Sequence, residues 1–180
     1  MKLYKLAVWG SLGLVHCTAY SQDTVILKES DVSEKSLIDA LTPERQIRTR
    51  SIRITPDSGD QAAPVKRPSA SMLITFETNS AQLKPQARKM LDSLGKAMTS
   101  DKLLKFKFAI EGHADPRGGE QFNLQLSQKR AETVVSYLTD NHRIDATRLR
   151  PVGKGQSELV NVTHPDAPEN RRVTVKTLIE

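Results

Sequence analysis

The stretch "KFKFAIEGHADPRGGEQFNLQLSQKRAETVVSYL", residues 105–138, contains the clearest structural patterns of the sequence. Its first nine residues alternate, with Phe106, Phe108 and Ile110 on one side and two lysines and a glutamate on the other. This period of two predicts a strand that is covered on one face. The glycines and the proline of "GHADPRGGEQ" predict a loop of tight turns. The remainder, from Asn123 to Leu138, predicts a helix, so the stretch forms a strand, a loop and a helix.

One cation interrupts the apolar row of this predicted helix. Leu126, Arg130, Val134 and Leu138 follow one another at steps of four and should lie along one side. A guanidinium is very costly to bury alone, so Arg130 needs a counter-charge. The preceding loop presents Asp115 at the carboxyl end of the strand, within reach of the start of the helix.

Two interpretations of this pair remain open at this point. In the first, Asp115 and Arg130 form a structural salt bridge, or Arg130 reaches solvent with its stem over the apolar row. In the second, a ligand carboxylate pairs with the guanidinium while Asp115 accepts a ligand ammonium. The stretch "NRR", residues 170–172, starts the last predicted strand and can arrive beside the same edge of the sheet.

The patterns on either side complete an α+β domain at residues 71–180. "SMLITFE" (71–77) predicts a strand by alternation, and "KPQARKMLDSLGKAM" predicts an amphipathic helix. "LRPVGKG" predicts a short strand, "SELVNVTHPDAPEN" a loop and "RRVTVKTLIE" a last strand. The order β-α-β-α-β-β predicts a two-layer sandwich, with a mixed sheet, both helices on one face and the other face partly exposed to solvent.

The segment before this domain predicts export and a tether. Residues 1–21 have two lysines, an apolar run from Leu6 to His16 and small residues before Gln22, as a secretory signal peptide does. The run is shorter than the roughly 20 residues that cross a bilayer. Cys17 offers a rival lipidation site, although His16 stands where that site prefers a small residue.

Residues 22–70 are poor in large apolar residues and end in a stretch rich in Pro, Ser, Gly and Ala, which predicts a mostly disordered tether. Within it, residues 33–41 predict a short helix that is capped by Ser33 and is marginal unless it docks on something. The only cysteine is Cys17, so a chain cut before Gln22 has no disulfide and relies on packing.

The charge distribution argues against a nucleic-acid partner. Of the formal net charge of +6, two lysines belong to residues 1–21, residues 22–70 are balanced, and residues 71–180 carry seventeen bases and thirteen acids. The excess is dispersed, as on a solvated surface.

The sequence predicts no enzyme, metal site or cofactor. His113 lies two residues before Asp115, but no further ligand-type residue is expected beside it. Ser127 fits a helix N-cap and lacks the setting of an activated nucleophile. The sequence specifies no oligomeric state.

Five motifs together carry a family resemblance. They are "ITFETNSAQLKPQARKMLDSL", "IEGHADPRG", "NLQLSQKRAETVVSYL", "RLRPVGKG" and "NRRV", in this order. From Leu73 to Val175 the chain resembles the peptidoglycan-binding domain at the C-terminus of outer membrane protein A and in peptidoglycan-associated lipoproteins, the OmpA-like family. The resemblance implies non-catalytic, non-covalent binding of the peptide stem of the cell wall by a periplasmic protein. Association with the outer membrane through a protein partner is a further expectation.

The resemblance also assigns roles to individual residues. The aspartate of the G-H-x-D loop, here Asp115, is expected to bind the ammonium of diaminopimelate in the stem peptide. The arginine of L-S-x-x-R-A, here Arg130, is expected to bind its carboxylate. Ala114 departs from the family, in which many members have Thr there. The remaining positions that match pocket-lining or bracing residues are Phe76, Thr78, Asn79, Asn123, Leu126 and Arg171.

An alternative function places the activity in the tether. In that hypothesis residues 23–66 bind a partner in the cell envelope, and the domain serves as the wall anchor. The short predicted helix is the feature that supports it.

Overall fold

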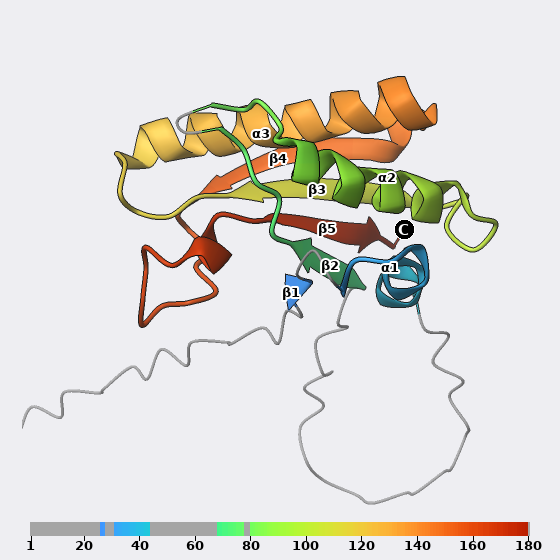
Figure 1. Ribbon diagram of the computed structural model, residues 1–180, viewed down its shortest axis with the longest axis horizontal. Coiled ribbons are helices and arrows are strands. Elements are labelled where there is room, and N and C mark those ends of the chain that lie inside the picture. Colours follow the sequence, from blue (N-terminus) through green and yellow to red (C-terminus); the bar gives the residue numbers. More distant parts are fainter. Residues whose placement is uncertain (1–25, 28–30, 44–67, 78–79, 180) are drawn as a thin grey trace, which may run out of the picture.

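Five strands form one mixed sheet in the order β1-β2-β5-β3-β4 (Figure 1). The computed structural model describes residues 26–27, 31–43, 68–77 and 80–179, so the predicted signal peptide and Cys17 lie outside the described residues. In chain order the strands and α-helices are β1 (Ile26–Leu27), α1 (Glu34–Leu41), β2 (Ser69–Met72), α2 (Pro85–Thr99), β3 (Lys107–His113), α3 (Glu120–His142), β4 (Leu149–Gly155) and β5 (Val173–Leu178).

The last strand lies in the middle of the sheet. β5 pairs antiparallel with β2 on one side and with β3 on the other, whereas β3 pairs parallel with β4. α3 connects these two parallel strands and runs along them, with α2 beside it (Figure 1). The predicted α+β class and the order of elements from β2 to β5 are confirmed; β1 and α1 precede them.

Apolar side chains from the helices and one sheet face form a single core. α2 contributes Leu91, Leu94 and Met98, as its spacing predicts, and all three are fully buried. Phe108 of β3 and Leu138 of α3 are also inaccessible to solvent. Each such side chain contributes about 1.5–3 kcal/mol by its removal from water, so this layer supplies most of the stabilisation.

The first predicted strand is wrong in its bounds. The strand predicted at 71–77 is β2 at Ser69–Met72. Its partner β5 begins at Val173, which pairs with Met72, so within the described residues the antiparallel ladder ends at Met72. The N–H of Ile74 then donates to the carbonyl of Met72, and Phe76 forms only an isolated bridge with Leu83. Phe76 consequently leaves the sheet.

The helix predicted at residues 33–41 forms, and it is part of the core. The Ser33 hydroxyl accepts from the Ser36 N–H, and the Ser36 hydroxyl accepts from the Ser33 N–H, which is a reciprocal cap. Leu37 and Leu41 are fully buried, and the Thr177 hydroxyl donates to the Leu41 carbonyl at 2.6 Å. The packed part of the chain therefore begins before residue 71, where the sequence places the domain boundary.

Two glycines let α3 lie directly on β3 and β4. A Cβ at Gly112 would collide with the Ser127 carbonyl oxygen, and one at Gly153 would come within 2.7 Å of the Gln128 nitrogen. Both approaches involve the backbone of α3, which cannot move aside easily. This contact fixes the distance between α3 and the loop that follows β3.

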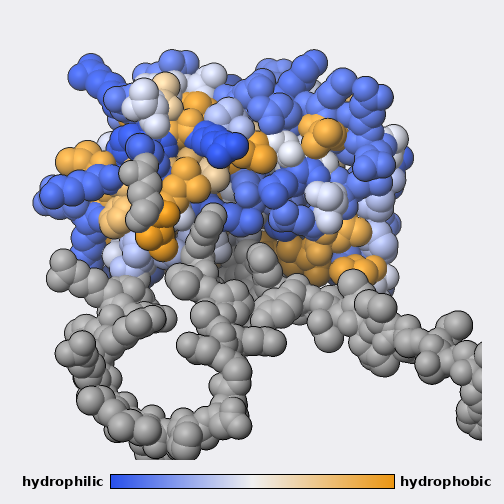
Figure 2. Space-filling model, turned by 180° about the vertical axis from the view of Figure 1, so that it is seen from behind, coloured by the Kyte–Doolittle hydropathy of each residue, from blue (hydrophilic) through white to orange (hydrophobic). Residues whose placement is uncertain are grey.

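The second face of the sheet is less exposed than predicted. Because side chains alternate along β3, Glu111 and His113 point away from the helices, yet they are only 7% and 2% exposed. Seen from behind, hydrophilic side chains cover most of the described surface, with smaller apolar patches between them (Figure 2). Among the described residues, no helix combines the length and the apolar character needed to cross a bilayer.

Candidate functional site

The loop after β3 holds a carboxylate that is already hydrogen-bonded. Oδ1 of Asp115 accepts from the Arg117 N–H at 3.2 Å. Oδ2 accepts from Nε and Nη2 of Arg117 at 3.2 and 2.9 Å, and from Nη1 of Arg171 at 2.7 Å. Burial alone would raise the pKa of Asp115, but the hydrogen bonds from the two arginines outweigh it and keep that pKa below its ordinary value. Asp115 is therefore an anion at neutral pH.

Arg130 is partly buried on α3, and it has no anionic hydrogen-bond partner among the described residues. Its Nε donates to the Ser80 carbonyl at 3.1 Å, and its guanidinium carbon lies 4.9 Å from the centre of the Phe76 ring. Within the described part of the chain it forms no ion pair with a carboxylate. Burial first, and then repulsion by Arg171, lower the pKa of Arg130, and Asp115 offsets this only in part. The site would gain from an added anion.

Asp115 and Arg130 line the same pocket. The pocket has a volume of about 740 Å³, within the range of sites that hold small ligands. Four cationic side chains and two carboxylates line it, together with apolar residues. Of the residues predicted from the sequence, the lining includes Phe76, Asp115, Asn123, Leu126, Arg130 and Arg171. Thr78 and Asn79 lie outside the described residues.

Among the described residues, Asp115 and Arg130 do not form the salt bridge of the first interpretation. The ion pairs of Asp115 are with Arg117 and Arg171. Arg117 lies two residues beyond Asp115, and its backbone N–H donates to the Asp115 carboxylate and so closes a turn. This turn also brings the Arg117 side chain back to the same carboxylate. The guanidinium of Arg130 instead lies over the Phe76 ring. The two opposite charges therefore face one pocket without neutralising each other.

Two buried amides hold the loops of the pocket. The Asn123 side chain donates to the carbonyls of Asp115 and Gly118 at 2.9 and 3.2 Å and to Gln156 Oε1 at 2.8 Å, which ties α3 to the Asp115 loop.

Asn170, fully buried, organises the loop before β5. Its Oδ1 accepts from two backbone N–H groups and its Nδ2 donates to three backbone carbonyls, those of Asn161, His164 and Pro165.

Sequence reasoning missed Arg117 as a member of the site, although its position two residues after an aspartate in a turn was a usable signal. It also missed the pocket-lining Phe122, which is 51% exposed at the start of α3. Ser127 is not an N-cap, because α3 begins at Glu120; its hydroxyl donates to the Leu124 carbonyl and accepts from the Gly155 N–H. That hydroxyl is thus committed to structure.

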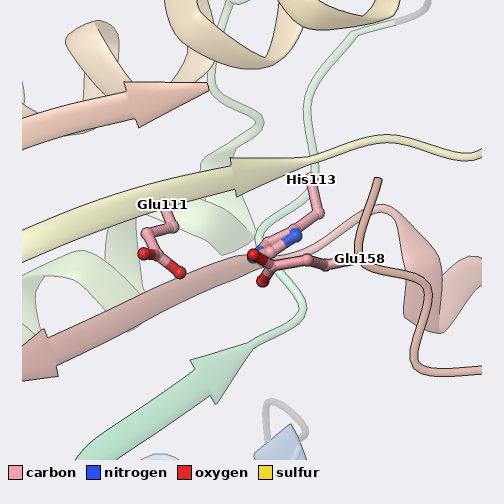
Figure 3. A group of neighbouring side chains, drawn as sticks. All are labelled: Glu111, His113 and Glu158. Carbon is pink, nitrogen blue, oxygen red and sulfur yellow. The ribbon is translucent and has the colours of Figure 1, made fainter. Parts of the chain in front are cut away.

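A second polar cluster lies on the opposite face of the sheet. The cluster consists of Glu111, His113 and Glu158, each of which offers one atom that could bind a metal ion, and these atoms lie within 4.8 Å of one another (Figure 3). The sequence suggested no such neighbours for His113. Lys176 lies 2.6 Å from Glu111 and Lys154 lies 2.7 Å from Glu158. These ammonium groups already balance the two carboxylates, so a divalent cation would have to displace them, and we assign no metal here.

His113 is also unsuited to acid–base chemistry. It is 2% exposed, and both ring nitrogens lack a hydrogen-bond partner among the residues described. Burial, together with the nearby Arg172, Lys176 and Lys154, lowers the pKa of His113 to about 3, so the ring is neutral at physiological pH. A substrate could not reach it without opening the sheet face.

Comparison with known proteins places this fold and pocket in a family. The sequence profile of the OmpA family matches residues 75–173, which is more than half of the chain and includes both Asp115 and Arg130. The chain belongs to the OmpA family.

Relatives of this OmpA-family chain share its described domain. The probable lipoprotein YiaD of Escherichia coli is 36% identical over 104 residues, which cover 57% of the chain and 46% of the relative. Outer membrane protein P5 of Haemophilus influenzae is 32% identical over 128 residues, 67% of the chain and 35% of the relative. The chain thus spans less than half the length of these two. The peptidoglycan-associated lipoprotein of Pseudomonas aeruginosa is 26% identical over 178 residues, 98% of the chain and 99% of the relative.

Solved structures support the same fold. The OmpA-like domain of FopA1 from Francisella tularensis superposes with a TM-score of 0.52 at 21% identity, over 60% of the chain and 70% of that structure. The cell wall anchor of the T6SS from Pseudomonas aeruginosa has a TM-score of 0.52 at 24% identity, over 64% of the chain and 84% of that structure. At these identities the likeness establishes the fold alone.

Proposed function

We propose that the pocket binds peptidoglycan non-covalently through the diaminopimelate of the stem peptide. In this proposal Arg130 binds the carboxylate of the free amino-acid end and Asp115 binds its ammonium. The observation that carries it is Arg130 itself, which is partly buried beside a pocket with no carboxylate paired to it in the described residues. A ligand carboxylate would supply the missing charge through a bidentate, charge-assisted pair.

The charges of the pocket favour a zwitterion over a simple amine. Cationic side chains outnumber carboxylates in the lining, so a lone ammonium would meet repulsion from Arg130 and Arg171. An amino-acid end offers a carboxylate to Arg130 at the same time. Phe76 and Leu126 add apolar surface against which the methylene chain of diaminopimelate can pack. Because few charge pairs carry the binding and they stay partly exposed, affinity is modest and falls with salt.

The names of two similar proteins support a role at the cell wall. One relative is named a peptidoglycan-associated lipoprotein, and one structural neighbour is described as a cell wall anchor. By analogy, the domain serves this chain as a non-catalytic anchor in the cell envelope. A protein of the outer membrane is a further partner that this role accommodates.

The location follows from the proposed signal peptide at residues 1–21. Cleavage before Gln22 would release a periplasmic chain, whereas lipidation of Cys17 would attach it to a membrane. The intact mass of the mature protein distinguishes the two, because a chain starting at Gln22 lacks any acyl group.

The alternative function, partner binding through residues 23–66, loses the feature that supported it. Leu37 and Leu41 of α1 are buried in the core and are not available to a partner. Residues 23–25, 28–30 and 44–66 of that segment lie outside the described residues.

Co-sedimentation with isolated sacculi tests the proposed function. The wild-type chain should sediment with the sacculi and be released by free meso-diaminopimelate. Asp115→Ala and Arg130→Ala should remain in the supernatant at the same protein concentration. Arg88→Ala, which removes an exposed arginine from α2, is the matched control and should behave as wild type. Undiminished sedimentation of both pocket variants would overturn the proposal.

A further inference from the structure

The carboxylate that should receive the ligand ammonium is already occupied. Three N–H groups of Arg117 and Arg171 converge on Oδ2 of Asp115, at 2.7 to 3.2 Å. Oδ1 accepts only from the backbone of Arg117 among the contacts of the described residues. An incoming ammonium must therefore replace one of these arginines on Oδ2 or bind beside them on Oδ1, where their positive charge repels it.

The two arginines differ in how firmly they are held. The Arg171 side chain is 36% exposed, donates a second hydrogen bond to the Asp166 carbonyl at 3.0 Å, and follows the buried Asn170. The Arg117 side chain is 64% exposed, and within the described residues its guanidinium donates only to Asp115. Arg117 can swing into solvent by side-chain rotation, because most of its side chain is exposed and, among the described residues, Asp115 is the partner that its guanidinium would have to release.

We infer that Arg117 is an intramolecular competitor of the ligand ammonium, which must leave Asp115 before the ligand can bind. Arg117 would neutralise Asp115 while the pocket is empty, and the ligand would exchange one cation for another at that oxygen. This inference deepens the proposed function and rests on it.

The exchange makes binding reversible and dependent on the carboxylate of the ligand. Replacing a guanidinium by an ammonium at Asp115 brings little net gain, since one charge-assisted pair is lost for each one formed. The net gain must come from Arg130, whose charge is unpaired within the described residues until the ligand carboxylate arrives. An amine without a carboxylate makes the unfavourable exchange and gains nothing from Arg130.

Titrations of wild type and Arg117→Ala with three small probes test the inference. The probes are meso-diaminopimelate, L-lysine, which lacks one of its carboxylates, and 1,5-diaminopentane, which lacks both. Binding is followed by ¹⁵N-detected chemical shifts, which report weak affinities. Arg88→Ala controls for the loss of one positive charge. Asp115 keeps Arg171 as its partner in Arg117→Ala, so the variant should fold.

Loss of the competitor should strengthen binding. The Arg117→Ala variant should bind meso-diaminopimelate about two- to fivefold more tightly than wild type, the range expected for removal of one exposed ion pair. A second reading comes from the Arg117 Nε–H resonance of the wild type, which should move toward its solvent-exposed position as meso-diaminopimelate saturates.

Unchanged or weaker binding by Arg117→Ala, with wild-type binding intact, would overturn the inference and assign Arg117 a structural or ligand-contacting role. This result would leave the proposed function standing. Failure of wild type and variant alike to bind either meso-diaminopimelate or sacculi would overturn both.

Discussion

Replacement of Arg130 by Ala should separate stability from binding. In the structure this change removes one hydrogen bond, from Nε to the Ser80 carbonyl, and the contact with the Phe76 ring. These contribute about 0.5–1.5 kcal/mol and about 0.5–1 kcal/mol. The change also relieves the desolvation of the guanidinium and its repulsion by Arg171, which both oppose folding. We expect the free energy of unfolding to fall by about 1 kcal/mol or less.

The effect on binding should be larger. A hydrogen bond to a charged group contributes about 1.5–3 kcal/mol, so loss of the ligand carboxylate's partner should weaken binding about 10- to 150-fold. Urea denaturation measures the first quantity, and titration with meso-diaminopimelate measures the second. Arg88→Ala again serves as the control for charge.

A structural role for Arg130 would reverse this pattern. Removal of one partner of a buried ion pair costs about 3–5 kcal/mol. A loss of that size from Arg130→Ala, with binding by the remaining folded protein unchanged, would refute the assignment of its counter-ion to the ligand.

Three further predictions concern the pocket, the loop beside it and the core. The pKa of Asp115 is depressed in the folded state, so the contribution of Asp115 to stability is present above the ordinary aspartate pKa of about 3.9 and is lost as the pH falls through the lowered value. Asp115→Asn should therefore reduce the loss of thermal stability at acidic pH, as measured by thermal scans from pH 2 to 7. The same loss of stability in the variant and the wild type would contradict this prediction. Asn170→Ala should lower the free energy of unfolding by about 2 kcal/mol in urea denaturation, because five backbone groups lose their hydrogen bonds to the side chain. It should also weaken binding to sacculi through the adjacent Arg171; no effect on either quantity would show that Asn170 does not organise the loop before β5. Leu41→Ala should cost about 2–5 kcal/mol because Leu41 is fully buried, whereas a helix that only belonged to a tether would tolerate the change without measurable loss.

Local patterns were sufficient for the part of the fold that carries the pocket. Alternation in β3, tight-turn residues after it and the four-residue steps of α3 are properties of a single stretch of chain, and they place Asp115 and Arg130 at one edge of the sheet. The same stretch also shows why the unusual cation matters, since a guanidinium in an apolar row needs an explanation that packing does not supply.

Features that depend on distant partners were not accessible from local patterns. The end of β2 at Met72 is set by where β5 begins, not by the alternation that continues to Phe76. The burial of Leu37 and Leu41 depends on α2 and the sheet, which accept a short helix that would be marginal alone. The neutralisation of Asp115 required the positions of two arginine side chains, one of which, Arg171, lies two residues before β5.

In our proposal one zwitterionic end of diaminopimelate lies between Asp115 and Arg130. An NMR titration of the ¹⁵N-labelled chain with a stem tripeptide that ends in meso-diaminopimelate tests this placement. We expect saturable shifts at the backbone amides of Asp115 and Asn123 and at the Arg130 Nε–H, and none with the tripeptide that ends in 1,5-diaminopentane. Saturable shifts that are confined to the opposite sheet face around Glu111 and Glu158, or the same shifts with both tripeptides, would contradict it.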